Sequence, residues 1–221
     1  MNVAEAPAKR AFRRLAPDER RRQIVREAVA YFAEFGFEGA TRGLAERLGV
    51  TQPLIYRYFP SKDDLIGAVY EEVYLGRWRA EWLDLLGRRE TPLRERLIRF
   101  YSHYTGVVFE PEWMRIYLFS GLRGLDINRW WITFVEEHVL TRICEEVRVE
   151  AGLPGPDKTP ITAAEIDAYW LFHGGIFYYG MRENVYRVAP RTSLARFIEL
   201  SIDSFLAGFP ATVSRALSHL F

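Results

Sequence analysis

Apolar residues recur along most of the chain at intervals of three and four, which is the spacing of a helix that buries one face. The first such run extends from Ile24 to Phe35. Pro17, with two acidic residues behind it, suits the first turn of this helix, and Gly36 suits its end. No segment alternates apolar and polar residues as a half-buried strand does. The pattern therefore predicts an all-helical protein.

Three short helices are expected after the first one. The first spans about 41–48, with Thr41 as a plausible cap and Gly49 suited to the left-handed turn behind it. The next follows the cap residue Thr51 and ends near Phe59, because a proline follows. Ser61 then caps another helix, with an aspartate at the capping-box position. Two short helices joined by a glycine turn form a helix-turn-helix unit.

The downstream pattern stays helical. Residues 153–160, LPGPDKTP, form the clearest loop in the chain. Further helices are expected from Pro92 to before Pro111, over 113–120, over about 128–151, from the capping box of Thr162 and Glu165 to about Tyr186, and from Thr192 or Ser193 to near Gly208.

Composition and charge narrow the class of protein. The 221 residues are 49% hydrophobic, enough for a substantial core. No apolar run reaches the roughly 18 residues of a membrane span, and the N-terminus is basic, so a cytoplasmic protein without a signal peptide is expected. Residues 1–26 carry eight basic and three acidic side chains, although the net charge is only +1. Such an arm fits phosphate contact, and a solvated tail is the alternative.

The helix predicted after Thr51 sorts its side chains onto two faces. At about 100° per residue, Ile55 and Phe59 fall on one side, where they can pack against the first helix. Glutamine and arginine suit base edges, tyrosine and arginine suit phosphates, and a helix of this size fits the major groove. A surface that reads DNA is therefore predicted on the opposite face, which carries Gln52, Pro53, Tyr56 and Arg57.

The run GFEGATRGLAERLGVTQPLIYRYFPSKDDL resembles the DNA-binding domain of TetR-family transcriptional regulators, over a match of about Ile24 to Val69. The resemblance implies base-edge contacts from Gln52, Pro53, Arg57 and Arg42, with Leu54 beside them. It implies phosphate contacts from Thr41, Tyr56, Tyr58 and Lys62, and it places Thr51 at the start of the recognition helix. Between Gly36 and Leu44 the chain is one residue shorter than the family pattern, so either Ala40 or Thr41 is expected to cap the second helix.

The same resemblance implies a three-part chain. Residues 1–16 would be a basic arm, 17–69 a three-helix DNA-binding domain, and 70–221 a helical domain that binds a ligand and forms a homodimer through its last two long helices. That last domain is rich in tyrosine and tryptophan, whose polar tips need partners when buried, so a cavity for an apolar or aromatic effector is expected. The residues expected to line it are Tyr104, Trp113, Tyr117, Trp131, Trp170, His173 and Phe177.

No catalytic or metal-binding pattern competes with this interpretation. The four histidines share no ligand spacing, and the single cysteine, Cys144, has no evident histidine partner. No enzyme activity, metal or cofactor is therefore expected. The sequence favours a repressor that leaves a palindromic double-stranded operator when a small apolar or aromatic effector binds. The alternative is a helical binding or scaffold protein whose N-terminal unit does not read DNA.

Overall fold

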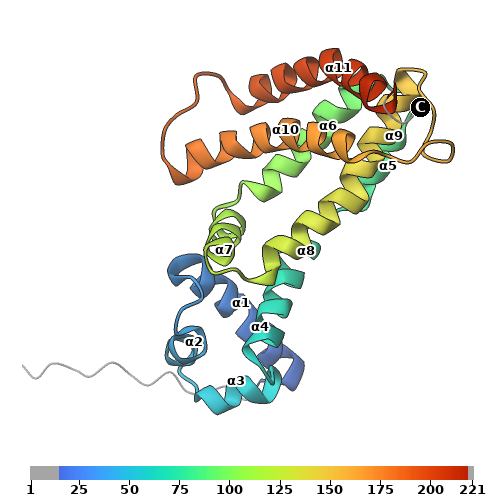
Figure 1. Ribbon diagram of the computed structural model, residues 1–221. Coiled ribbons are helices and arrows are strands. Elements are labelled where there is room, and N and C mark those ends of the chain that lie inside the picture. Colours follow the sequence, from blue (N-terminus) through green and yellow to red (C-terminus); the bar gives the residue numbers. More distant parts are fainter. Residues whose placement is uncertain (1–14, 219–221) are drawn as a thin grey trace, which may run out of the picture.

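The computed structural model describes residues 15–218, and within that range it contains helices and no strand (Figure 1). Three π-helical turns, η1, η2 and η3, directly continue the helices that precede them. The elements are α1 (Pro17–Phe35), α2 (Ala40–Leu48), α3 (Gln52–Tyr58), α4 (Lys62–Tyr70), η1 (Glu71–Leu75), α5 (Glu81–Gly87), α6 (Leu93–Val108), α7 (Pro111–Leu122), α8 (Asp126–Val135), η2 (Glu136–Leu140), α9 (Thr141–Glu150), α10 (Ala163–Gly180), η3 (Met181–Val185) and α11 (Leu194–Ser218).

Helices α1 to α4 close around a small apolar core. Ile24 and Phe32 of α1 are fully buried, as are Leu44 of α2 and Ile55 of α3. The turn between α2 and α3 follows the prediction, because Gly49 adopts a left-handed conformation with φ of 66°. The capping box at the start of α4 is also present, with the Asp64 amide donating to Ser61 Oγ over 3.0 Å.

The start of α2 differs from the prediction. Neither Ala40 nor Thr41 caps this helix, because it begins at Ala40 and its cap is Gly39. Gly39 has φ of 57°, a left-handed conformation that favours glycine over any residue with a side chain. Gly43, which is unusual inside a helix, lies where a Cβ atom would come within 2.1 Å of the Tyr31 hydroxyl oxygen. Any larger residue at position 43 would therefore have to displace the Tyr31 side chain.

The C-terminal helices form a second layer of packing above this unit. In Figure 1, α10 and α11 run side by side at the end of the molecule farthest from α3, while α7 lies over α1. The segment α8–η2–α9 runs continuously from Asp126 to Glu150, close to the predicted span of about 128–151. The capping box at the start of α10 is present, since the Glu165 amide donates to Thr162 Oγ1. The fold class is thus all-α, as predicted.

Two features of this part were not predicted correctly. Helix α11 does not end near Gly208 but continues through Pro210 to Ser218. Phe209 and Val213 are buried on either side of that proline, so continued burial of the apolar face outweighs the missing backbone hydrogen bond. Helix α5 was not expected at all, although burial of Trp82 holds this short helix against the core.

A buried ion pair fixes the loop between α9 and α10. Arg148 and Glu165 are both fully buried and are joined by two hydrogen bonds of 2.8 and 2.6 Å. Arg148 also donates to the backbone carbonyls of Pro154 and Pro160, each over 3.1 Å. Burial alone would raise the pKa of Glu165, but the hydrogen bonds from Arg148 and Thr162 hold it below its ordinary value. The pair therefore stays ionised inside the fold.

Candidate nucleic-acid interface and effector cavity

The outer face of α3 stands free of the rest of the molecule. Pro53, Tyr56 and Arg57 are exposed, whereas Ile55 and Phe59 are buried against the core. The division into two faces therefore matches the helical arrangement predicted from the sequence. Leu54 and Tyr58, at the sides of the helix, are partly buried.

Side chains of α2 and α3 meet in a small polar cluster at the start of both helices. Gln52 Nε2 donates to Thr41 Oγ1 over 2.9 Å, and that oxygen lies 3.4 Å from the Tyr56 hydroxyl. Thr41 therefore lies inside α2, in its first turn, and does not act as the cap. The cluster restrains Gln52 and Tyr56 before any partner is present. Restraint of this kind lowers the entropy cost of contacting a partner.

The cations of this surface differ in how firmly the protein holds them. Arg57 pairs with none of the carboxylates in the part of the chain that the structure describes, and its guanidinium carbon lies 5.5 Å from the Tyr58 ring centre. Arg42 contacts Glu46 over 3.3 Å, but both side chains are mostly exposed, so this pair is weak. Lys62 Nζ donates to the Phe37 carbonyl over 2.9 Å. An ammonium group has three donors, so Lys62 retains two for a phosphate.

Two further points concern the edges of this surface. Thr51 is exposed at the start of α3, and its hydroxyl makes no capping hydrogen bond. Arg21 of α1, which was not predicted individually, has its guanidinium carbon 5.0 Å from the centre of the Phe59 ring. It thereby brings a basic residue of α1 to the end of α3. The run of arginines at positions 20–22 was the sequence feature that could have indicated Arg21. Residues 1–14 of the predicted basic arm lie outside the described residues.

The residues predicted to line an effector cavity come together in the structure. A cavity of about 80 Å³ lies among α6, α7, α8 and α10. Ile132 and Gly174, which were not predicted, also border it. Most of its wall is aromatic ring, so it suits an apolar or aromatic group. All seven predicted residues line it: Tyr104, Trp113, Tyr117, Trp131, Trp170, His173 and Phe177.

A buried chain of polar groups runs behind one wall of the cavity. The Tyr101 hydroxyl lies 2.7 Å from that of Tyr169 and 3.2 Å from His173 Nδ1. On the other side of the imidazole, Nε2 lies 3.4 Å from the Tyr104 hydroxyl. Burial lowers the pKa of His173 to about 4, so the ring is neutral at pH 7. The chain is uncharged, because burial also raises the pKa values of Tyr101, Tyr104 and Tyr169.

Helix α7 connects this cavity with the N-terminal unit. Trp113 and Tyr117 on α7 line the cavity. Arg115, between them, donates to the backbone carbonyls of Ala33 and Glu34 at the end of α1. These carbonyls have no partner within their own helix, so Arg115 caps α1 from the other domain. A displacement of α7 would therefore change the hydrogen bonds that Arg115 makes at the end of α1.

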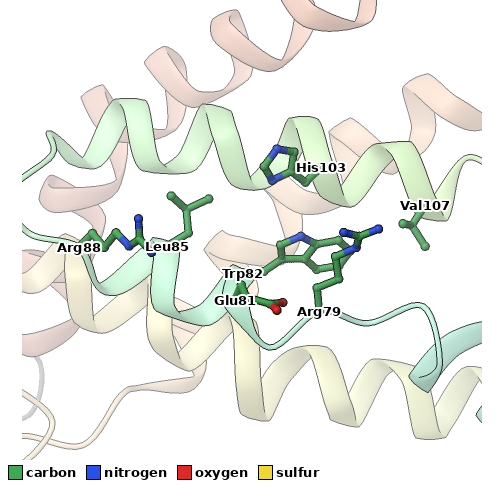
Figure 2. Close-up of a pocket in the computed structure, with 7 residues that line it drawn as sticks. All are labelled: Arg79, Glu81, Trp82, Leu85, Arg88, His103 and Val107. Atoms are coloured by element: carbon green, nitrogen blue, oxygen red, sulfur yellow. The ribbon is translucent and has the colours of Figure 1, made fainter.

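A larger cleft of about 470 Å³ opens between α5 and α6 (Figure 2). Figure 2 shows His103 of α6 facing Trp82 of α5, with Arg79 and Glu81 nearby and Arg88 at the far end. This cleft was not predicted, because α5 itself was missed. Its charges are of both signs, so it carries no clear preference for an anion or a cation. Trp82, which lines this cleft, packs edge-on against Tyr104 of the aromatic cavity, with 6.2 Å between ring centres.

Two other kinds of site were sought among the described residues. Within residues 15–218, no three histidine, cysteine, aspartate or glutamate side chains gather in a way that would hold a metal ion. Cys144 is buried, and burial raises the pKa of its thiol to about 12. No helix in the described range is both long and apolar enough to cross a membrane.

Known proteins resemble this chain in one segment of sequence and in overall fold. Residues 24–69 match the family model TetR_N, described as "Bacterial regulatory proteins, tetR family". A search of curated proteins gives no match. A TetR family transcriptional regulator from Pseudomonas syringae pv. tomato str. DC3000 has 17% sequence identity and a TM-score of 0.57, over 87% of this chain and 97% of that one.

Two more solved structures agree with this likeness. A TetR-like transcriptional regulator from Rhodococcus sp. RHA1 has 22% identity and a TM-score of 0.58, over 88% of this chain and 100% of that one. A TetR-family transcriptional regulator from Streptomyces coelicolor has 18% identity and a TM-score of 0.59, over 92% and 90%. At these low identities, the solved structures support a shared fold and nothing more. The chain therefore carries a DNA-binding domain of the tetR family, within the overall fold of TetR-family transcriptional regulators.

Proposed function

We propose that this protein is a repressor that binds a palindromic operator as a homodimer and releases it when a small apolar or aromatic effector enters the cavity lined by Trp113 and Trp170. The observation that carries the proposal is the free outer face of α3 within a tetR-family domain. An exposed helix that presents an arginine without a carboxylate partner suits the major groove of DNA.

On the DNA side, base edges would be contacted by the side chains that α3 leaves exposed or partly exposed. Arg57 supplies two donors for the O6 and N7 acceptors of a guanine, Gln52 supplies one donor and one acceptor for the edge of an adenine, and Pro53 offers an apolar surface to a thymine methyl. Leu54 flanks them, and Arg42 reaches the groove by giving up its weak contact with Glu46. Phosphates would be bound by Thr41, Thr51, Tyr56, Tyr58 and Lys62.

The exposed face of α10 and α11 supports a homodimer. Leu171 is 82% exposed and Tyr178 is 54% exposed, which is unusual for such large apolar side chains. An apolar groove of about 530 Å³ follows this face between the two helices. A second copy can cover it through a two-fold axis, with both helices of each subunit forming a four-helix bundle. The two α3 helices would then contact successive half-sites of one operator.

Helix α7 is the element through which effector and operator would compete. An effector between Trp113 and Tyr117 bears on α7, and Arg115 transmits the displacement to the end of α1. The effector must bind the released conformation more tightly than the DNA-bound one, since equal affinity would shift nothing. In this proposal, α7 is the single helix that links the two sites.

Selection of bound sequences from random duplex DNA tests the proposal most directly. We expect enrichment of a palindrome, with affinity that falls as salt concentration rises. Arg57→Ala should reduce the enrichment and relax the preference at the base pair that Arg57 contacts, whereas Arg99→Ala, which changes an exposed arginine of α6, should leave both intact. A protein that binds every duplex equally, or none, would favour the scaffold alternative.

A further inference from the structure

The indole of Trp113 carries the one polar atom of the cavity wall that stands out as unsatisfied. The side chain is only 1% exposed, so bulk water does not reach it. Among the described residues, nothing lies within hydrogen-bonding distance of its Nε1 atom. A buried donor without an acceptor costs free energy, and such atoms are rare in folded proteins. The open space that this indole borders is the effector cavity.

Two other polar groups of the cavity wall, the indole of Trp170 and the imidazole of His173, already have partners. Trp170 Nε1 donates to the carboxylate of Glu136 over 2.7 Å. His173 is occupied on both ring nitrogens by tyrosine hydroxyls. Among the buried side-chain nitrogen and oxygen atoms of the cavity wall, Trp113 Nε1 is the one that the described residues leave without a hydrogen-bond partner.

The charges around the cavity narrow the class of ligand further. None of the residues that line the cavity is charged at pH 7, because burial holds His173 neutral. A bound anion would find no cationic side chain among these residues, and a bound cation would find no carboxylate. Glu136, behind Trp170, already accepts the indole hydrogen bond. Burying an unpaired ion carries a large desolvation cost, so the cavity favours an uncharged molecule.

We propose that the effector is an uncharged molecule with an oxygen acceptor, such as a ketone carbonyl, that receives a hydrogen bond from Trp113 Nε1. Its apolar body lies among the rings of Trp131, Trp170 and Phe177, which must move apart to admit it because the cavity measures only about 80 Å³. The inference rests on the proposed effector cavity and adds the chemistry that this cavity selects. The Tyr104 hydroxyl and His173, two of the polar groups expected from the sequence to meet the ligand, are engaged with one another instead.

Matched single-ring probes test this directly. Acetophenone carries a carbonyl acceptor, ethylbenzene has the same size without it, and benzoate and benzylammonium carry opposite charges. Calorimetric titration of the full chain should give about tenfold tighter binding of acetophenone than of ethylbenzene, the effect of one hydrogen bond. Both charged probes should bind more weakly than either neutral one.

Two variants separate the hydrogen bond from the loss of ring volume. The Trp113→Phe variant should bind acetophenone and ethylbenzene with about equal affinity. Trp170→Phe removes an indole of the same cavity whose nitrogen is already bonded to Glu136, so it should weaken both probes and keep the tenfold preference. If Trp113→Phe does not fold, nitrogen-labelled wild type provides the readout. Acetophenone should then shift one indole N–H resonance that ethylbenzene leaves in place.

The outcomes distinguish this inference from the proposed function. Equal binding of acetophenone and ethylbenzene to the wild type, or a preference that survives Trp113→Phe, overturns the role of Trp113 and leaves the effector cavity standing. Failure of both neutral probes to bind removes the cavity as an effector site and the inference with it. Tighter binding of benzylammonium than of acetophenone would overturn the uncharged class and favour recognition of a cation by the aromatic rings.

Discussion

Arg57 on α3 and Arg148 on α9 have the same side chain in opposite surroundings. Arg57 is exposed and pairs with no described carboxylate, while Arg148 is fully buried and donates to Glu165 and to backbone carbonyls. A guanidinium whose donors are satisfied internally holds the fold together. One whose donors remain open is available to a ligand, and on α3 the geometry suits DNA. The difference separates residues that shape the protein from residues that serve its partners.

The largest effect is expected from removing Arg148, the buried member of this comparison. Arg148→Ala leaves Glu165 buried without its counter-ion and frees the loop carbonyls, so it should lower the free energy of unfolding by roughly 3–5 kcal/mol. Urea denaturation at pH 7 measures the change. Arg42→Ala, which breaks the exposed pair with Glu46, is the control and should cost at most about 0.5 kcal/mol. Similar losses for the two variants would contradict the distinction between them.

Arg57, the exposed member of this comparison, should affect DNA binding much more than it affects the stability of the fold. Arg57→Ala should leave the unfolding free energy within about 1 kcal/mol of the wild type, since the exposed side chain loses only its contact with the Tyr58 ring and no ion pair with a described carboxylate. Binding to the selected operator should weaken by roughly 1–3 kcal/mol, with a much smaller change on unrelated duplexes. Fluorescence anisotropy with both DNAs checks this. Equal weakening on the two DNAs would reassign Arg57 to a phosphate contact.

His173 extends the comparison to a polar group that the fold keeps neutral. Burial lowers its pKa to about 4, against about 6.5 in the unfolded chain, so the unfolded state binds the proton first as the pH falls. The free energy of unfolding should therefore drop by about 2 kcal/mol between pH 7 and pH 5 through this group. Urea titrations of the wild type and of His173→Gln measure the difference. A variant that loses as much stability as the wild type over this range would exclude His173 as the cause.

Lys62 should give the smallest effect. Its ammonium group donates to the Phe37 carbonyl and keeps donors for a phosphate. Lys62→Ala should weaken all duplexes alike and reduce the slope of log affinity against log salt by about one. Lys158→Ala, in the loop between α9 and α10, is a matched loss of charge away from α3 and should leave the slope unchanged. A sequence-dependent loss with Lys62→Ala would place this residue among the base contacts.

Local chemistry explains which parts of the fold could be predicted. The end of α3 before Pro60, the capping boxes at Ser61 and Thr162, and the buried positions Ile55 and Phe59 all depend on neighbours within one or two turns. The start of α2 could not be derived in this way. Gly39 caps it only because the chain turns there through a left-handed conformation, which both Ala40 and Thr41 would resist.

Features that depend on residues far apart in the chain could not be predicted from the sequence. The last helix was expected to end near Gly208, but packing of Phe209 and Val213 carries α11 through Pro210. Glu165 was recognisable as the partner of Thr162, although nothing local indicated Arg148. The cavity residues were expected together because of the family resemblance and their aromatic character. The unpartnered nitrogen of Trp113 could be seen only once every neighbour had been placed.

The loop LPGPDKTP has the composition of a segment that proteases cut and that tolerates inserted sequence. Its backbone, however, is tied to the buried guanidinium of Arg148 at Pro154 and Pro160. Cleavage there requires the loop to separate from an ion pair in the interior, so its opening is coupled to wider unfolding of the domain. An engineer who needs a site for a tag or a circular permutation should therefore avoid this loop, despite its appearance.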